Sequence, residues 1–265
     1  MPLPSALLLD LDGTLYTDAG PIPGAVDAIA ELRRRHLPFR FVTNTTRRSR
    51  RGLVERLRGY GFEVDPAEVF TSVMAGVRLL RERGIVRVAP FVARDTLEDL
   101  SAFELLGGTS AAPAAAAAPP AAVVIGDLGD QWTPALLNQA FRCVLDGALL
   151  IALQKDRYWL GRTGLELDAG PYVAAIEYAT GRASVVCGKP SAGFYLGALA
   201  DLGVTTPGAA AMVGDDLWAD VGGAQHAGLR GWLVRTGKFR EDVLAQSGVK
   251  PDRILDSVVG LVRAA

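Results

Sequence analysis

Two aspartates that could do chemistry lie near the start of the chain. The apolar residues 6–9 precede Asp10 and Asp12, and the turn residues Gly13 and Thr14 follow them. The apolar run predicts a strand buried on both faces, and alternate residues of an extended chain point the same way. The two carboxylates can therefore converge on one cation or one reacting group, which would relieve the repulsion between them. For an Asp-x-Asp found alone, a strand that ends in a polar turn is the simpler interpretation.

Polar side chains also end three other predicted strands. They are Thr43 and Asn44 after residues 39–42, Lys189 after residues 183–187, and Asp215 and Asp216, with Asp220 beyond, after residues 209–214. In an open parallel sheet, ligands bind at the carboxyl ends of the strands. Three carboxylates and water suit Mg²⁺, while a hydroxyl, an amide and an ammonium can hold a phosphate. The pattern predicts a magnesium and phosphate site at one edge of the sheet.

Each of these residues also has an ordinary structural explanation. A threonine at a strand end forms turns, a lysine is often solvated, and Asp215 could cap the next helix. Asp216 and Asp220 would complement the dipole of that helix as acidic residues in its first turn. Because polar residues end four strands in the same way, we favour a common site.

The elements that must position these residues alternate along the chain. Apolar residues at helical spacing over 26–32 and 53–60 flank the strand at 39–42, and the same alternation resumes from residue 184 to the end. Strands that alternate with helices predict a doubly wound parallel sheet of the Rossmann-like α/β class.

The middle of the chain has a looser pattern. It contains predicted helices over 75–83, 134–145 and 171–179 and predicted strands over 86–92, 121–126 and 149–153. We expect a smaller α/β domain at 76–183, inserted into a core of residues 1–75 and 184–265. Within it, the Gly/Ala/Pro tract 107–120 predicts a mobile loop. Asp127, Asp130, Gln131 and Trp132 form a loop that could face the substrate, although Trp132 could equally belong to the core.

Composition narrows the class of protein. The chain has 265 residues, 49% of them apolar, and a formal net charge of −1, which gives no reason to expect nucleic acid or a membrane surface as partner. No apolar run reaches the ~18 residues of a membrane span, and no secretory signal is expected at the start. Two cysteines are too few for a disulfide framework, so a cytoplasmic location is predicted.

The motifs resemble those of a known family. Asp-x-Asp-Gly-Thr at 10–14, Thr43, Lys189 and Gly-Asp-Asp-x-x-x-Asp at 214–220 are similar, in order and context, to the four motifs of the haloacid dehalogenase-like (HAD) hydrolases. Residues 42–44, 188–190 and 235–239 resemble subfamily IIA, whose C2-type cap domain lies between the Thr and Lys motifs. Residues 164–167 and 170–172 resemble the phospholysine phosphohistidine inorganic pyrophosphate phosphatases, some of which carry serine where this chain has Asp12.

The resemblance implies a role for each residue. Asp10 would be the nucleophile that forms an aspartyl-phosphate, and Asp12 the general acid and base. The Asp10 and Asp215 side chains and the Asp12 carbonyl would hold Mg²⁺, while Thr43, Asn44 and Lys189 would bind the phosphoryl group. Asp216 and Asp220 would lie behind these residues and orient Lys189 or a metal-bound water.

These roles predict a Mg²⁺-dependent phosphatase for small phosphorylated molecules, either monoesters or pyrophosphate and phosphoamino compounds. A phosphomutase uses the same motifs, and a non-catalytic phosphate or nucleotide sensor could keep the same fold, although a sensor has no need of Asp12. Dehalogenase chemistry needs no metal and is disfavoured. The resemblance also suggests a homodimer formed through the inserted domain.

Overall fold

The computed structural model describes residues 4–110, 118–161 and 164–263. Contacts divide the chain into two compact units, residues 1–43, 53–70 and 189–265 in the first and residues 44–52 and 71–188 in the second. Residues 44–52 were expected in the core domain, but they belong to the second unit, because they form hydrogen bonds with its loops. The Thr96 hydroxyl donates to the Thr46 carbonyl at 2.6 Å, and the Ser49 N–H donates to Asp95 Oδ2 at 2.7 Å.

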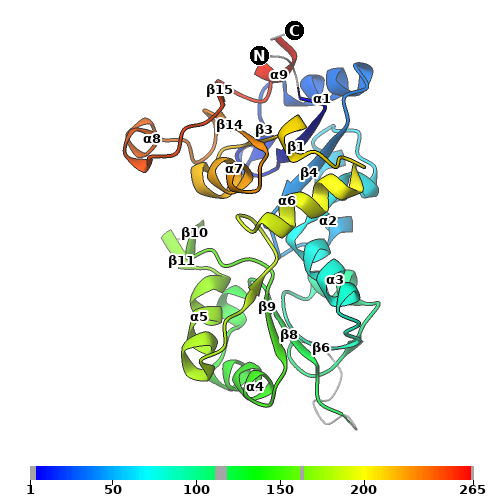
Figure 1. The fold of residues 1–265 in the computed structure, drawn as a ribbon, viewed down its shortest axis with the longest axis vertical. Coiled ribbons are helices and arrows are strands. Elements are labelled where there is room, and N and C mark those ends of the chain that lie inside the picture. The colour runs from blue at the N-terminus through cyan, green and yellow to red at the C-terminus, as the bar shows by residue number, and fades with distance from the viewer. Residues whose placement is uncertain (1–3, 111–117, 162–163, 264–265) are drawn as a thin grey trace. The chain divides into compact units, whose positions relative to one another are not determined.

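The first unit is built on a six-stranded sheet in the order β15-β14-β13-β1-β4-β5 (Figure 1). The strands are β1 (Ala6–Asp10), β4 (Phe39–Thr43), β5 (Val69–Thr71), β13 (Ala210–Gly214), β14 (Arg230–Val234) and β15 (Arg253–Leu255). Strand β1 pairs in parallel with β4 and β13, β13 pairs in parallel with β14, and β14 pairs in parallel with β15. The predicted parallel α/β core is therefore confirmed, with β1 inside the sheet and Leu7, Leu8 and Leu9 fully buried.

Short hairpin strands and helices complete this unit. They are β2 (Tyr16–Thr17), β3 (Gly20–Pro21), α1 (Ala25–Arg34), α2 (Arg50–Gly59) from Leu53 onward, α6 (Ala192–Asp201), α7 (Gly223–His226), α8 (Glu241–Ser247) and α9 (Gly260–Arg263). The main core cluster joins apolar side chains of β1 and β4, such as Leu9 and Phe41, to Ile29 of α1 and Leu53 of α2. This packing fixes the strands whose ends carry the polar residues.

The second unit contains a separate five-stranded sheet in the order β12-β9-β8-β6-β7, with parallel pairing throughout. Its strands are β6 (Arg87–Phe91), β7 (Glu104–Leu105), β8 (Ala122–Ile125), β9 (Leu149–Ala152) and β12 (Val185–Val186), and β10 (Tyr158–Gly161) and β11 (Gly164–Leu167) form an antiparallel hairpin. Helices α4 (Pro134–Leu145) and α5 (Ala169–Thr180) cover one face, and α3 (Ser72–Glu82) covers the other. The inserted α/β sheet is thus confirmed.

Four details differ from the expected elements. The strand predicted over 183–187 is reduced to β12, and α5 begins two residues before the expected helix because Asp168 caps it there. The helix expected after Asp216 begins as a π-helix, Leu217–Gly222, before α7. Of the tract 107–120, residues 111–117 lie outside the described residues, whereas Thr109 is anchored by bonds from its hydroxyl to the Pro90 and Val92 carbonyls.

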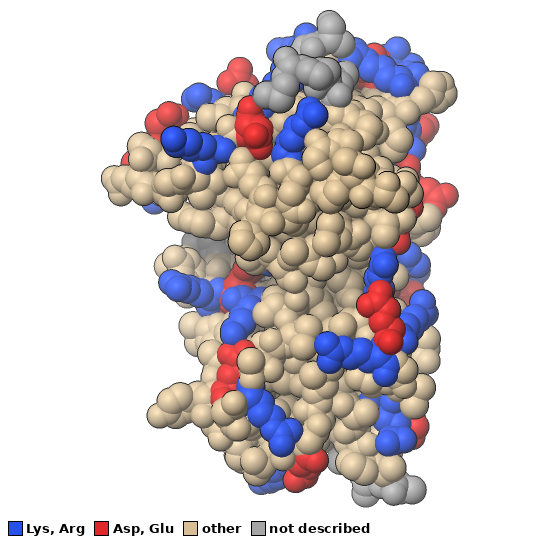
Figure 2. Space-filling view, viewed as in Figure 1, with Lys and Arg blue, Asp and Glu red and all other residues tan. Residues whose placement is uncertain are grey.

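The surface matches the composition. On the face drawn in Figure 2, Lys and Arg are interspersed with Asp and Glu, in keeping with the formal net charge of −1. None of the helices in the described part of the chain has the length and apolar composition of a membrane span.

Candidate active site

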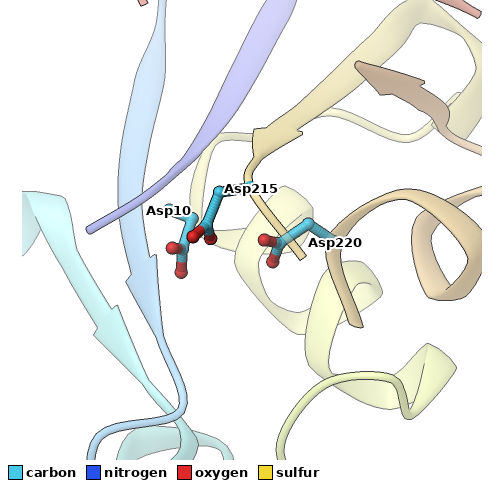
Figure 3. Close-up of side chains that lie close together, drawn as sticks. All are labelled: Asp10, Asp215 and Asp220. Carbon is cyan, nitrogen blue, oxygen red and sulfur yellow. The ribbon is translucent and has the colours of Figure 1, made fainter. Parts of the chain in front are cut away.

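Three buried carboxylates meet at the carboxyl ends of neighbouring strands of the first unit. Asp10 is the last residue of β1, and the parallel register of Leu9 with Val213 brings the end of β13, and hence Asp215, beside it. Asp220 follows on the π-helix. One carboxylate oxygen from each of these three aspartates lies within 4.8 Å of the others, and Figure 3 shows their side chains together.

Lys189 lies between two of these carboxylates. Its Nζ donates to Asp10 Oδ1 at 2.5 Å and to Asp220 Oδ1 at 2.6 Å, and its side chain is only 5% exposed. Burial alone would lower the pKa of Lys189, but Asp10 and Asp220 raise it above its usual range. The lysine therefore remains an ammonium and neutralises part of the charge of the cluster.

Asp215 is enclosed by two loops that lack side chains at the point of contact. Its Oδ2 accepts a hydrogen bond from the Lys238 N–H at 2.7 Å. A Cβ built on Gly13 or on Gly237 would lie 2.0 Å from that oxygen, and both glycines have positive φ values, 79° and 59°. Glycine is required at both positions for the loops to close around Asp215.

The donor set fits a hard divalent cation. Three buried carboxylates lie together, and Lys189 donates to two of them, Asp10 and Asp220, so the negative charge of the cluster exceeds the one positive charge bonded to it. Burial raises the pKa of Asp215 to about 7, with Asp220 adding to the effect, and burial also raises the pKa of Asp10 against the opposing charge of Lys189. A divalent cation bound to the carboxylate oxygens would reduce the repulsion among these buried charges.

The other residues predicted for the site have different surroundings. Thr43 is buried at the end of β4, next to β1 in the sheet, whereas Asp12 is exposed and its backbone forms a bridge with Tyr16. Asn44 belongs to the second unit, where its Nδ2 donates to Asp156 Oδ2 at 3.4 Å. Its role in phosphate binding stays a prediction.

Asp216 and Asp220 differ in their contacts. Asp216 accepts hydrogen bonds from the Trp218 and Ala219 N–H groups at 3.0 and 2.9 Å, as a helix cap does, and pairs with Lys238 Nζ at 2.9 Å. Asp220 instead contacts Lys189 directly. Lys238 is a residue of this region that the motifs do not identify. The only sequence signal for it is the Thr-Gly-Lys that follows the strand β14.

In the loop of residues 127–132, which could face a substrate, Asp127 and Trp132 make contacts that stabilise the second unit. Asp127 accepts two hydrogen bonds from Arg47, at 2.5 and 3.2 Å, and Arg47 lies over the Trp159 ring. Trp132 stacks on Phe91 and on Tyr172, with ring centroids 6.0 and 4.7 Å away, so it packs against the core. Asp130 and Gln131 are exposed.

We expect Asp168→Asn to raise the unfolding free energy relative to the wild type more at high pH than at low pH. Burial raises the pKa of Asp168 to about 6. The Gln154 Nε2 and the Ala169 N–H both donate to its Oδ1, an oxygen that asparagine also has. An unfolded aspartate ionises near pH 3.9, so ionisation costs the wild type stability between about pH 4 and pH 6.

The measurement is urea denaturation of both proteins at pH 4.5 and pH 7.5. The difference in unfolding free energy should move by about 2 kcal/mol in favour of the variant at the higher pH. An equal difference at both pH values would contradict the expectation.

Comparison with known proteins assigns an N-terminal and a C-terminal segment of the chain to one family. The model of haloacid dehalogenase-like hydrolases matches residues 7–105, and a HAD-hydrolase-like model matches residues 186–261. Human haloacid dehalogenase-like hydrolase domain-containing protein 2 is 43% identical over 235 residues, 89% of this chain and 85% of the relative. Human phospholysine phosphohistidine inorganic pyrophosphate phosphatase is 38% identical over 263 residues, 97% of this chain and 92% of the relative.

A solved structure agrees with this assignment. The p-nitrophenyl phosphatase from Archaeoglobus fulgidus matches with a TM-score of 0.89 and 29% identity, over 100% of both chains. The carboxylates at the strand ends and these relatives lead to the same conclusion: the chain belongs to the haloacid dehalogenase-like hydrolases, as a phosphatase of subfamily IIA.

Proposed function

We propose that the chain is a Mg²⁺-dependent phosphatase that hydrolyses phosphate monoesters of small molecules through an aspartyl-phosphate on Asp10. The observation that carries the proposal is the Lys189 ammonium bonded to both Asp10 and Asp220 inside the buried carboxylate cluster. This arrangement supports the proposal, because phosphoryl transfer requires a nucleophile, a fixed positive charge and oxygen ligands close together.

The reaction divides into two displacements at phosphorus. A carboxylate oxygen of Asp10 forms a bond to phosphorus as the bond to the leaving oxygen breaks, and Asp12 gives that oxygen a proton. Water then attacks the phosphorus of the aspartyl-phosphate and loses a proton to Asp12, which releases phosphate and restores Asp10. The exposed position of Asp12 suits a group that must exchange protons with a substrate.

The remaining residues stabilise charge. Lys189 offsets the repulsion between the Asp10 carboxylate and the phosphoryl oxygens, and Thr43 and Asn44 are proposed to donate hydrogen bonds to those oxygens. The Asp10 and Asp215 side chains and the Asp12 carbonyl are the groups proposed to hold Mg²⁺, which supplies further screening of negative charge when bound.

The names of the relatives suggest which substrates to test. One relative is a p-nitrophenyl phosphatase, and another is named for phospholysine, phosphohistidine and pyrophosphate. We propose small monoesters as the main class and pyrophosphate or phosphoamino compounds as the second. A homodimer through the second unit and a cytoplasmic location stay as proposals.

We expect hydrolysis of 4-nitrophenyl phosphate to require the metal. Removal of divalent cations with EDTA should lower kcat by about 100-fold or more, because a bound cation contributes several kcal/mol to charge stabilisation in phosphoryl transfer. Release of inorganic phosphate should return when excess MgCl₂ is added. Full activity in EDTA would overturn the metal requirement, and transfer of the phosphoryl group within a sugar phosphate without phosphate release would favour a mutase.

A further inference from the structure

The turn that carries Asp220 is an unusual element. It is the π-helix Leu217–Gly222, a form that occurs mostly as single turns and frequently at functional sites. Asp220 is fully buried there, and its N–H donates to the Asp216 carbonyl at 2.9 Å. Its Oδ2 accepts from the Asp216 N–H at 3.0 Å, while Oδ1 faces Lys189. The conformation of this turn therefore sets the position of Asp220 relative to Lys189.

Tyr195 on α6 holds the turn from the side of the helix. Its side chain is fully buried, and its hydroxyl donates to the carbonyl of Ala219, the residue directly before Asp220. A Cβ on Gly223 would lie 2.4 Å from the Tyr195 hydroxyl and 2.6 Å from Pro190 Cβ. The turn is thus packed closely against both Tyr195 and the residue that follows Lys189.

We propose that Tyr195 is a positioning residue for the phosphatase reaction: its hydroxyl fixes the Ala219 carbonyl so that Asp220 meets Lys189 in the geometry that catalysis needs. The proposal rests on the function proposed above, because it assigns Tyr195 an effect only through Asp220 and Lys189. The hydrogen bond of the Tyr195 hydroxyl goes to the backbone carbonyl of Ala219, so Tyr195 acts through the turn.

Two further observations support this role. Burial raises the pKa of Tyr195, so its hydroxyl keeps its proton and remains a donor throughout the working pH range. The space around Asp220 is also tight, because a Cβ on Gly214 would lie 2.1 Å from Asp220 Oδ2. A small shift of the turn would therefore change the contact between Asp220 and Lys189 instead of being absorbed by empty space.

The test is a double-mutant cycle on kcat for 4-nitrophenyl phosphate with saturating Mg²⁺. Tyr195→Phe should lower kcat about tenfold, and Asp220→Asn should lower it about 10- to 100-fold, as supporting residues of such sites do. In the Asp220→Asn background, Tyr195→Phe should have no further effect, because residues that act through one another are not additive. A merely structural tyrosine would lower kcat by the same factor in both backgrounds.

Tyr60→Phe is the matched control. Tyr60 lies in the same unit and its ring contacts that of Tyr16 in a tilted arrangement, with ring centroids 5.3 Å apart. The Tyr60 hydroxyl accepts from Arg56 Nε at 3.4 Å. Tyr60→Phe also removes one hydroxyl, but kcat should stay within about twofold of the wild type, because that hydroxyl is bonded to Arg56 on α2, a different element from the turn that carries Asp220. If Tyr195→Phe does not fold by circular dichroism, Gly223→Ala disturbs the same contact and is measured in the same two backgrounds.

An unchanged kcat in Tyr195→Phe, or an equal loss in both backgrounds, would overturn the proposal. If Asp10→Asn is inactive but Tyr195→Phe lowers kcat equally in both backgrounds, the positioning role of Tyr195 is overturned and the proposed function is not. An Asp10→Asn variant that retains activity overturns the proposed function as well.

Discussion

Asp10→Asn is expected to lower kcat for 4-nitrophenyl phosphate by about 10⁴-fold or more, because an amide does not attack phosphorus. The substitution keeps the size of the side chain and leaves an oxygen that can still accept from Lys189 Nζ, which is 2.5 Å from Asp10 Oδ1 in the wild type. The loss should therefore be chemical. Steady-state kinetics with Mg²⁺ measure it, and thermal denaturation checks that the variant is folded.

Asp27→Asn is the control for this change. Asp27 is an exposed residue in the first turn of α1, and its substitution exchanges a carboxylate for an amide in the same way. Its kcat should equal that of the wild type. If Asp10→Asn instead retained more than about one hundredth of the wild-type kcat, an aspartyl-phosphate route would be excluded, because a nucleophile in covalent catalysis contributes far more than this.

Much of the site follows from one rule about parallel sheets. The apolar run of β1 ends at Asp10, Asp215 directly follows that of β13, and strands buried on both faces appear in a sequence as continuous apolar runs. Because such strands run in the same direction, Asp10 and Asp215 had to emerge at the same edge once the two strands were neighbours. The register of β1 with β13 meets that condition.

The remaining features depend on contacts between distant residues. Gly13 and Gly237 both close on Asp215 Oδ2, although more than two hundred residues separate them, and a glycine in a loop carries no signal for its partner. Asn44 follows Thr43 directly, yet it packs with the second unit, because the chain changes unit between these two residues. The contact of Asp220 with Lys189 likewise depends on a π turn, which residue spacing does not distinguish from the start of an α-helix.

Lys189→Met is expected to lower the unfolding free energy by about 3–5 kcal/mol and to lower kcat strongly. Removal of one partner from a buried ion pair leaves the other charge without compensation, and here two carboxylates, Asp10 and Asp220, lose the cation they share. Urea denaturation without added metal measures the stability, and the kinetics of 4-nitrophenyl phosphate hydrolysis with Mg²⁺ measure the activity.

Lys155→Met provides the comparison that separates burial from charge. Lys155 pairs with Glu177 at 2.6 Å, nearly the same distance as the bonds of Lys189, but the two side chains are 36% and 21% exposed. A pair with this access to water contributes about 0–1 kcal/mol, so the same substitution should change stability little and leave kcat unchanged. Equal losses of unfolding free energy and kcat in the two variants would mean that burial does not strengthen the contribution of Lys189. A large loss at Lys189 alone would show that the buried carboxylates depend on its charge, as the proposed phosphoryl-transfer chemistry requires.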